Sequence, residues 1–325
     1  MKFNFCAIIS RNVHTLHGQA SRAGDDIVDR RIISILMLFT TSFIWGSSFV
    51  AQIFGMQYIG PFTFCAVRYL VSALVMVPVA LAMDSWRGED MEVHALYARW
   101  RSCLKSGVIC GCALFFATGL QQIGLLFTGA GKTAFITTLY IIIVPIYGIF
   151  SGKKLSKTMV IAVAMCLVGL YLLTIKGDFS IGPGDAFVLA GAFFWAAHIV
   201  VSAKFVRGLD AVKLSTIQFA TVAVISSIPM FALEMPKVQA LIWSWLPIFY
   251  ASVISTGIAY TFQMAAQRYV PPVAASLVLS TEALFAAIFG FIMLGERFTA
   301  PEAIGATILL AGTLIAQIRG VNSQS

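Results

Sequence analysis

The sequence predicts an all-α membrane protein, with ten transmembrane helices arranged as two inverted five-helix repeats. Composition, the spacing of apolar runs and an internal repeat predict this fold class. Of the 325 residues, 59% are hydrophobic and 11% are charged, whereas a soluble domain is about one quarter charged. So few charges cannot cover a soluble surface, and the composition therefore excludes a cytosolic enzyme, a nucleic-acid-binding domain and a disordered chain.

Ten apolar runs are long enough to be membrane spans. A helix needs ~20 apolar residues to cross the hydrocarbon core, and turn and charge signals separate one run from the next. The predicted spans are 33–53, 62–83, 106–127, 133–150, 158–175, 185–203, 214–233, 241–262, 270–294 and 302–318. The shortest of them are marginal alone, and we expect neighbouring helices to shield them.

The two ends of the chain are predicted to be tails. Residues 1–31 are polar and basic, and the apolar patch at 5–10 is too short for a signal-peptide core. We therefore expect 1–31 to be a cytoplasmic N-terminal tail. A start placed upstream of the native one is the alternative interpretation. Residues 319–325 are predicted to be a cytoplasmic C-terminal tail.

The distribution of Lys and Arg predicts the orientation. With the N-terminus inside, the inner segments hold 17 of the 22 basic residues and the outer loops hold three. Basic loops stay on the cytoplasmic side of a membrane. The bias predicts a multi-pass protein with both termini in the cytoplasm. An odd number of spans would destroy this bias.

The two halves of the sequence are weakly similar to each other. Gly152 and the residues after it recur at Gly295, 143 residues later, while Trp45 corresponds to Trp195 at a spacing of 150. The repeats are predicted at 32–176 and 183–318. Because five spans is an odd number, the halves must have opposite orientations. Inverted repeats are typical of secondary transporters, which bind solute near the midplane between the repeats. A scaffold that transports nothing remains an alternative.

Polar residues inside the predicted spans are the candidate site residues, because ionisable side chains in hydrocarbon are costly. Glu282 is the only acid deep in a span and is expected to bind a proton or a cationic group. Arg68 is a candidate to bind an anionic solute or pair with Glu282, and the alternative is snorkelling or an interhelical hydrogen bond to a carbonyl. His198 is a candidate to carry protons, and the alternative is a hydrogen-bonded packing residue. Lys132 is expected to snorkel to the outer surface. Further candidates are Trp45, Trp195, Tyr140, Gln121, Gln218 and Gln263.

Several segments resemble a known family. Phe43-Ile44-Trp45-Gly46-Ser47-Ser48-Phe49, the arginine-bearing segment Pro61–Tyr69, and Ser280-Thr281-Glu282-Ala283 followed by Leu294-Gly295-Glu296-Arg297 are similar to the EamA branch of the drug/metabolite transporter superfamily. Ala283 stands where that family usually has a proline. The resemblance covers about 33–318. It implies a ten-helix bundle of two five-helix repeats and solute transport across the plasma membrane.

We therefore expect a secondary active transporter, an exporter of a small metabolite or drug-like solute that is proton-coupled through Glu282. An intramembrane enzyme is the rival class. The sequence lacks His-Glu-x-x-His, but a Ser–His dyad using His198 remains open. No cofactor or metal is expected, because the six cysteines lack metal-ligand spacing. The expected partners are the lipid bilayer, a small solute and protons, and the expected state is a monomer or homodimer.

Overall fold

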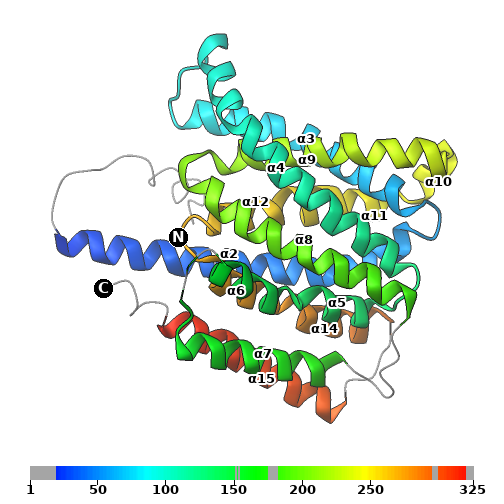
Figure 1. Cartoon of the computed structure of the whole chain (residues 1–325). Helices are drawn as coiled ribbons and strands as arrows, with labels where there is room; N and C mark the ends of the chain where they lie inside the picture. Colours follow the sequence, from blue (N-terminus) through cyan, green and yellow to red (C-terminus); the bar gives the residue numbers. More distant parts are fainter. Residues whose placement is uncertain (1–19, 151, 153, 175–181, 295–298, 320–325) are drawn as a thin grey trace.

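The computed structural model describes residues 20–150, 152, 154–174, 182–294 and 299–319, and in these residues its regular structure is entirely helical (Figure 1). The helices of the first half are α2 (Ala20–Gly55), α3 (Pro61–Trp86), α4 (Val93–Leu125), α5 (Ala130–Thr138), α6 (Tyr140–Phe150) and α7 (Lys157–Thr174). Those of the second half are α8 (Pro183–Phe205), η1 (Val206–Gly208), α9 (Ala211–Pro229), η2 (Met230–Glu234), α10 (Val238–Trp243), α11 (Trp245–Phe249), η3 (Tyr250–Ile258), α12 (Ala259–Ala266), α13 (Pro272–Leu279), α14 (Glu282–Leu294) and α15 (Ala300–Arg319).

Nine helical stretches of the described chain are long and apolar enough to cross a membrane. They are Asp29–Gly55, Pro61–Trp86, Val93–Leu125, Ala130–Phe150, Pro183–Gly208, Ala211–Glu234, Trp245–Ala266, Pro272–Met293 and Ala300–Gln317. A shorter apolar helix, Lys157–Leu173, coincides with the predicted fifth span. The other nine predicted spans each overlap one of the nine long stretches. The chain is therefore an all-helical, multi-pass membrane protein.

Two helices extend beyond the predicted spans. The first, α2, begins at Ala20, inside the segment predicted as a tail at 1–31. Similarly, α4 begins at Val93, well before the predicted start of its span at 106. An apolar run marks only the part of a helix that contacts lipid. The backbone hydrogen bonds of a helix are internal to the segment, so polar residues can continue the helix outside the bilayer.

Two spans are broken near their middle, one between α5 and α6 and the other between α13 and α14. In both, a threonine hydroxyl bonds a carbonyl of the preceding turn: Thr138 Oγ1 donates to the Ala134 oxygen at 2.9 Å, and Thr281 Oγ1 to the Val278 oxygen at 2.7 Å. Such bonds compete with the helix ladder and bend helices. The second break is present although residue 283 is an alanine.

The helices pack in pairs (Figure 1): α3 with α9, α4 with α8, α2 with α12 and α14, and α7 with α15 at one edge of the bundle. The α7–α15 contact is close. A methyl group at Gly169 would lie 2.5 Å from the backbone nitrogen of Leu309, and one at Gly305 would lie 2.6 Å from that of Leu173. Small residues at such crossings let transmembrane helices approach and gain van der Waals contact.

Candidate functional site

A cavity lies where the two broken spans meet α2, α3, α4, α8, η3 and α12; we call it the central cavity. It leaves about 30 Å³ open to the centres of water molecules, which is room for roughly two waters. Its lining residues are Trp45, Ser48, Phe49, Gln52, Arg68, Gln121, Thr137, Tyr140, Trp195, Ile199, Ser255, Tyr260, Gln263 and Glu282. Seven of the nine candidate residues from the sequence therefore line one cavity.

Glu282 and Tyr140 enter the central cavity from the two helix breaks. Tyr140 is the first residue of α6, and Glu282 is the first residue of α14. The Tyr140 hydroxyl donates to Glu282 Oε1 at 3.4 Å, and both residues are buried. At each break, some backbone groups lack their helix hydrogen bonds, and the first residue after the break lines the central cavity. Each broken span therefore contributes one polar group to the same point.

Arg68 lines the same cavity from α3 but is not ion-paired with Glu282. Its Nε donates to Thr256 Oγ1 at 2.7 Å, and its guanidinium carbon lies 5.0 Å from the ring centroid of Tyr69. A cation over an aromatic face gains electrostatic attraction. The Arg68 charge is thus held by a hydroxyl and a ring, with no carboxylate within ion-pair distance in the described chain.

Three aromatic rings form one wall of the cavity. The ring centroids of Trp45 and Tyr260 are 4.7 Å apart, and Trp195 lies 5.9 Å from Trp45. Trp195 and Tyr260 are close to parallel, with an interplanar angle of 12°. Trp45 Nε1 donates to the Ser255 carbonyl at 3.0 Å. The Trp45–Trp195 correspondence seen in the sequence therefore places the two indoles in contact.

Several polar atoms of this lining are buried without a hydrogen-bond partner in the described chain. They are Trp195 Nε1, Ser255 Oγ, Gln52 Oε1 and both amide atoms of Gln263. In contrast, Gln121 Nε2 is satisfied by Thr137 Oγ1 at 2.9 Å. Buried polar groups almost always bond to protein or ordered water, so these atoms call for a polar occupant. The cavity is chemically suited to a small solute with hydrogen-bonding groups.

His198 and Gln218 do not line the central cavity. His198 Nε2 lies 2.9 Å from Gln218 Oε1 and 3.3 Å from Ser202 Oγ, and all three side chains are buried. The contact between Ser202 and His198 lies within α8, and neither side chain has exposed surface. The arrangement joins α8 to α9.

Ser48 and Gln52 line the central cavity but were not among the candidate residues from the sequence. They lie three and seven residues after Trp45 on α2, which is the spacing of one helix face. The periodicity around Trp45 could therefore have identified them. Tyr260, a polar residue of the predicted span 241–262, also lines the cavity, three residues before Gln263 on α12.

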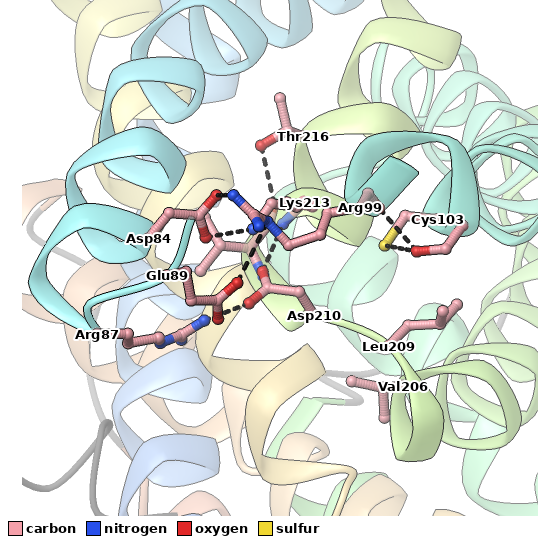
Figure 2. A network of polar contacts seen from close by, with 12 residues as sticks. Asp84, Arg87, Glu89, Arg99, Cys103, Val206, Leu209, Asp210, Lys213 and Thr216 are labelled. Carbon is pink, nitrogen blue, oxygen red and sulfur yellow. Dashed lines mark hydrogen bonds and ion pairs between the residues drawn. The ribbon is translucent and has the colours of Figure 1, made fainter. Parts of the chain in front are cut away.

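A cluster of charged side chains joins α3, α4 and α9 at one end of the bundle (Figure 2). We call it the ion cluster; its members are Asp84, Arg87, Glu89, Arg99, Asp210 and Lys213. Lys213 Nζ lies 2.5 Å from Asp84 Oδ1, and both side chains are almost fully buried. Arg99 contacts the other Asp84 oxygen at 3.4 Å. Asp84 lies one residue after the predicted span 62–83, and Lys213 lies one residue before the predicted span 214–233.

Asp210 belongs to the ion cluster and also caps α9. Its Oδ1 accepts hydrogen bonds from the backbone nitrogens of Val212 and Lys213, both at 2.9 Å, and Oδ2 pairs with Arg87 at 2.5 Å. Burial alone would raise the pKa of Asp210. The Lys213 backbone bond and the charges of Lys213 and Arg87 outweigh burial and lower this pKa below its usual value.

At the other end of the same helix pair, Glu234 caps α3. Its carboxylate accepts hydrogen bonds from the backbone nitrogens of Phe62 and Thr63 at 2.8 and 2.6 Å. The pair α3–α9 is therefore antiparallel and fastened at both ends. Lys132 is bound as well: its Nζ lies 2.5 Å from Asp185 Oδ2, so it pairs with an acid rather than only snorkelling as expected.

Comparison with known proteins identifies relatives over most of the chain. The model of the EamA-like transporter family matches residues 32–175 and 182–317. A protein of Archaeoglobus fulgidus named "Uncharacterized transporter" is 26% identical over 291 residues, covering 89% of this chain and 87% of the relative. "Uncharacterized transporter YoaV" of Bacillus subtilis is 23% identical over 288 residues, covering 86% and 94%. A solved crystal structure with 18% identity matches 90% of this chain and 99% of its own at a TM-score of 0.70, which supports the fold.

Proposed function

The chain belongs to the EamA-like transporter family, and from this premise we propose that it is a secondary active exporter of a small metabolite or drug-like solute. The solute binds in the central cavity, and transport is coupled to protons through Glu282. The protein lies in the plasma membrane, the inner membrane of a bacterium, with both termini in the cytoplasm. It works as a monomer or homodimer.

The observation that carries this proposal is the pairing of two helix breaks at one buried point. Tyr140 and Glu282 each begin a half-helix, and the cavity between them contains unsatisfied polar atoms. Broken helices from two repeats are the usual construction of a transporter site. The central cavity holds only a few waters, so solute binding requires the half-helices to separate. Separation at one side and then at the other would give alternating access.

The contacts between α3 and α9 support two inverted repeats, at 32–176 and 183–318. Asp84 pairs with Lys213, while Glu234 caps α3 at Thr63. Asp84 and Glu234 are 150 residues apart, as are Thr63 and Lys213. The spacing is the one that relates Trp45 to Trp195. Each acid thus fastens its own helix end to the beginning of the corresponding helix in the other half.

Glu282 is the coupling group in this proposal. A charged carboxylate buried in a membrane protein costs several kcal/mol unless a partner offsets it, and its nearest polar contact is the neutral Tyr140 hydroxyl at 3.4 Å. A proton or a cationic solute would each offset the charge. If the two compete for Glu282, proton entry releases the solute and the two movements become coupled.

The topology is tested by cysteine accessibility. Ser156, before α7, and Thr299, before α15, are exposed and are replaced one at a time by cysteine in a variant whose native cysteines are substituted. We expect a membrane-impermeant maleimide to label Thr299→Cys from outside intact cells, and Ser156→Cys only after the cells are opened. Labelling of both from the same side would refute the inverted repeat.

The coupling is tested in two steps. Untargeted metabolite comparison of a deletion strain and an overexpressing strain first identifies the exported solute. Transport of that solute into proteoliposomes is then measured with and without a pH gradient. We expect Glu282→Gln to lose gradient-driven accumulation but keep solute exchange, and Glu89→Gln, an acid outside the cavity, to match the wild type. Full gradient dependence in Glu282→Gln would leave Glu282 as a packing residue.

A further inference from the structure

A second cavity, of about 670 Å³, lies beside the ion cluster and shares no lining residue with the central cavity. We call it the lateral groove. It is lined by α2, α3, η3, α12 and the turn from η1 into α9. Val75, Val79 and Ile258 line it and are more than one third exposed. Because they lie within membrane spans, the groove opens toward lipid.

The lateral groove changes from apolar to basic along its length. Residues inside the spans, such as Met37, Val79 and Phe262, form the apolar part. Its rim toward the ion cluster carries four arginines and two acids, an excess of two positive charges. The rim residues are Arg30, Arg87, Arg207, Arg268, Glu89 and Asp210.

Some of the rim arginines have hydrogen bonds or ion pairs within the protein, and Arg207 has none among the described residues. Arg87 pairs with Asp210, and Arg268 donates to the carbonyls of Val206 and Leu209. Arg207 is exposed, and the described residues give its side chain no hydrogen bond or ion pair. The positive charge of Arg207 therefore faces outward at the mouth of an apolar groove.

We infer that the lateral groove binds an anionic phospholipid, with the phosphate at the arginine rim and an acyl chain along the apolar wall. A guanidinium fits a phosphate with two parallel hydrogen bonds. Basic pockets between transmembrane helices bind anionic head groups in this way. A soluble anion would pair with the rim arginines but leave the apolar wall of the groove empty. A lipid without net charge would cover the apolar wall but leave the excess positive charge of the rim uncompensated.

Binding is measured by native mass spectrometry on the delipidated, full-length protein in neutral detergent. The probes are phosphatidylglycerol, phosphatidylcholine and sn-glycerol 3-phosphate. We expect phosphatidylglycerol to bind more tightly than phosphatidylcholine, and glycerol 3-phosphate not to bind at the same concentration. Arg207→Gln should weaken phosphatidylglycerol binding about fivefold, the effect of one basic residue near an anionic head group. Arg101→Gln, an exposed arginine of α4 outside the groove, should change nothing.

The apolar wall has its own matched pair. Val79 and Val77 are 39% and 38% exposed on α3, and only Val79 lines the lateral groove. Val79→Trp should weaken the binding of both lipids, whereas Val77→Trp should not; gel filtration of each variant checks its fold. Three results would overturn the inference. One is equal affinity for phosphatidylglycerol and phosphatidylcholine, and another is binding of glycerol 3-phosphate as tight as that of phosphatidylglycerol. The third is an equal loss of lipid binding in Arg207→Gln and Arg101→Gln, or in Val79→Trp and Val77→Trp.

Discussion

Among the ion pairs of the described residues, the buried pair Asp84–Lys213 should be the costliest to break. The two side chains are 0% and 2% exposed and lie 2.5 Å apart. Removing one member of a buried pair leaves a charge in a medium that cannot solvate it, at a cost of about 3–5 kcal/mol in the free energy of unfolding. Replacing both members by apolar groups removes the charge and the partner together, and is often close to neutral.

The structure also predicts an order for the two single variants. Lys213→Met leaves Asp84 with Arg99 at 3.4 Å, so its loss should lie near the lower value, about 3 kcal/mol. No second carboxylate of the described chain lies within ion-pair distance of the Lys213 ammonium, so Asp84→Leu should cost more, about 4–5 kcal/mol. The double variant should return to within about 1–2 kcal/mol of the wild type.

Equilibrium unfolding in mixed micelles, followed by tryptophan fluorescence, measures these differences. Glu89→Gln is the matched control, because the Glu89–Arg99 pair is 32% and 24% exposed and such pairs contribute about 0–1 kcal/mol. Two results would refute the reasoning. One is a single variant no less stable than Glu89→Gln, and the other is a double variant whose loss equals the sum of the single losses.

Two further predictions concern other contacts. The pKa of Asp210 is lowered in the folded protein, so its contribution to stability is present above the unfolded pKa of about 3.9 and is lost as the pH falls through the folded value. The unfolding midpoint of the wild type should therefore fall more than that of Asp210→Asn between roughly pH 5 and pH 3 in buffered detergent, where a carboxyl with a lowered pKa begins to lose its contribution; parallel curves would contradict this. Gly169→Leu should separate α7 from α15 and cost at least the ~1–3 kcal/mol typical of overpacking, whereas Gly148→Leu, with nothing near its added methyl, should not. Thermal unfolding of both variants in one detergent decides between them.

The features that repeat along the chain could be predicted from its amino-acid order. Apolar runs of span length predicted where the helices lie, because a chain in lipid has no other way to satisfy its backbone. The cost of a charge in hydrocarbon identified Glu282 and Arg68, and both line the central cavity. The spacing of 150 residues related Trp45 to Trp195, and their rings are in contact. The use of these residues in transport stays a prediction.

Contacts between groups far apart in the chain depend on how the helices pack. Asp84 and Lys213 are 129 residues apart, so only the packing of α3 on α9 brings them together, and no local pattern distinguishes them from loop charges. His198 has the residue type of a proton carrier, yet its Nε2 lies against Gln218, and its side chain packs behind the cavity-lining rings of Trp195 and Tyr260 without lining the cavity itself. At each of the two breaks a threonine hydroxyl, that of Thr138 or Thr281, bonds the preceding turn. Threonines in unbroken helices make the same kind of bond, as Thr118 and Thr216 do at 2.8 Å, so the surrounding bundle selects where a span is broken.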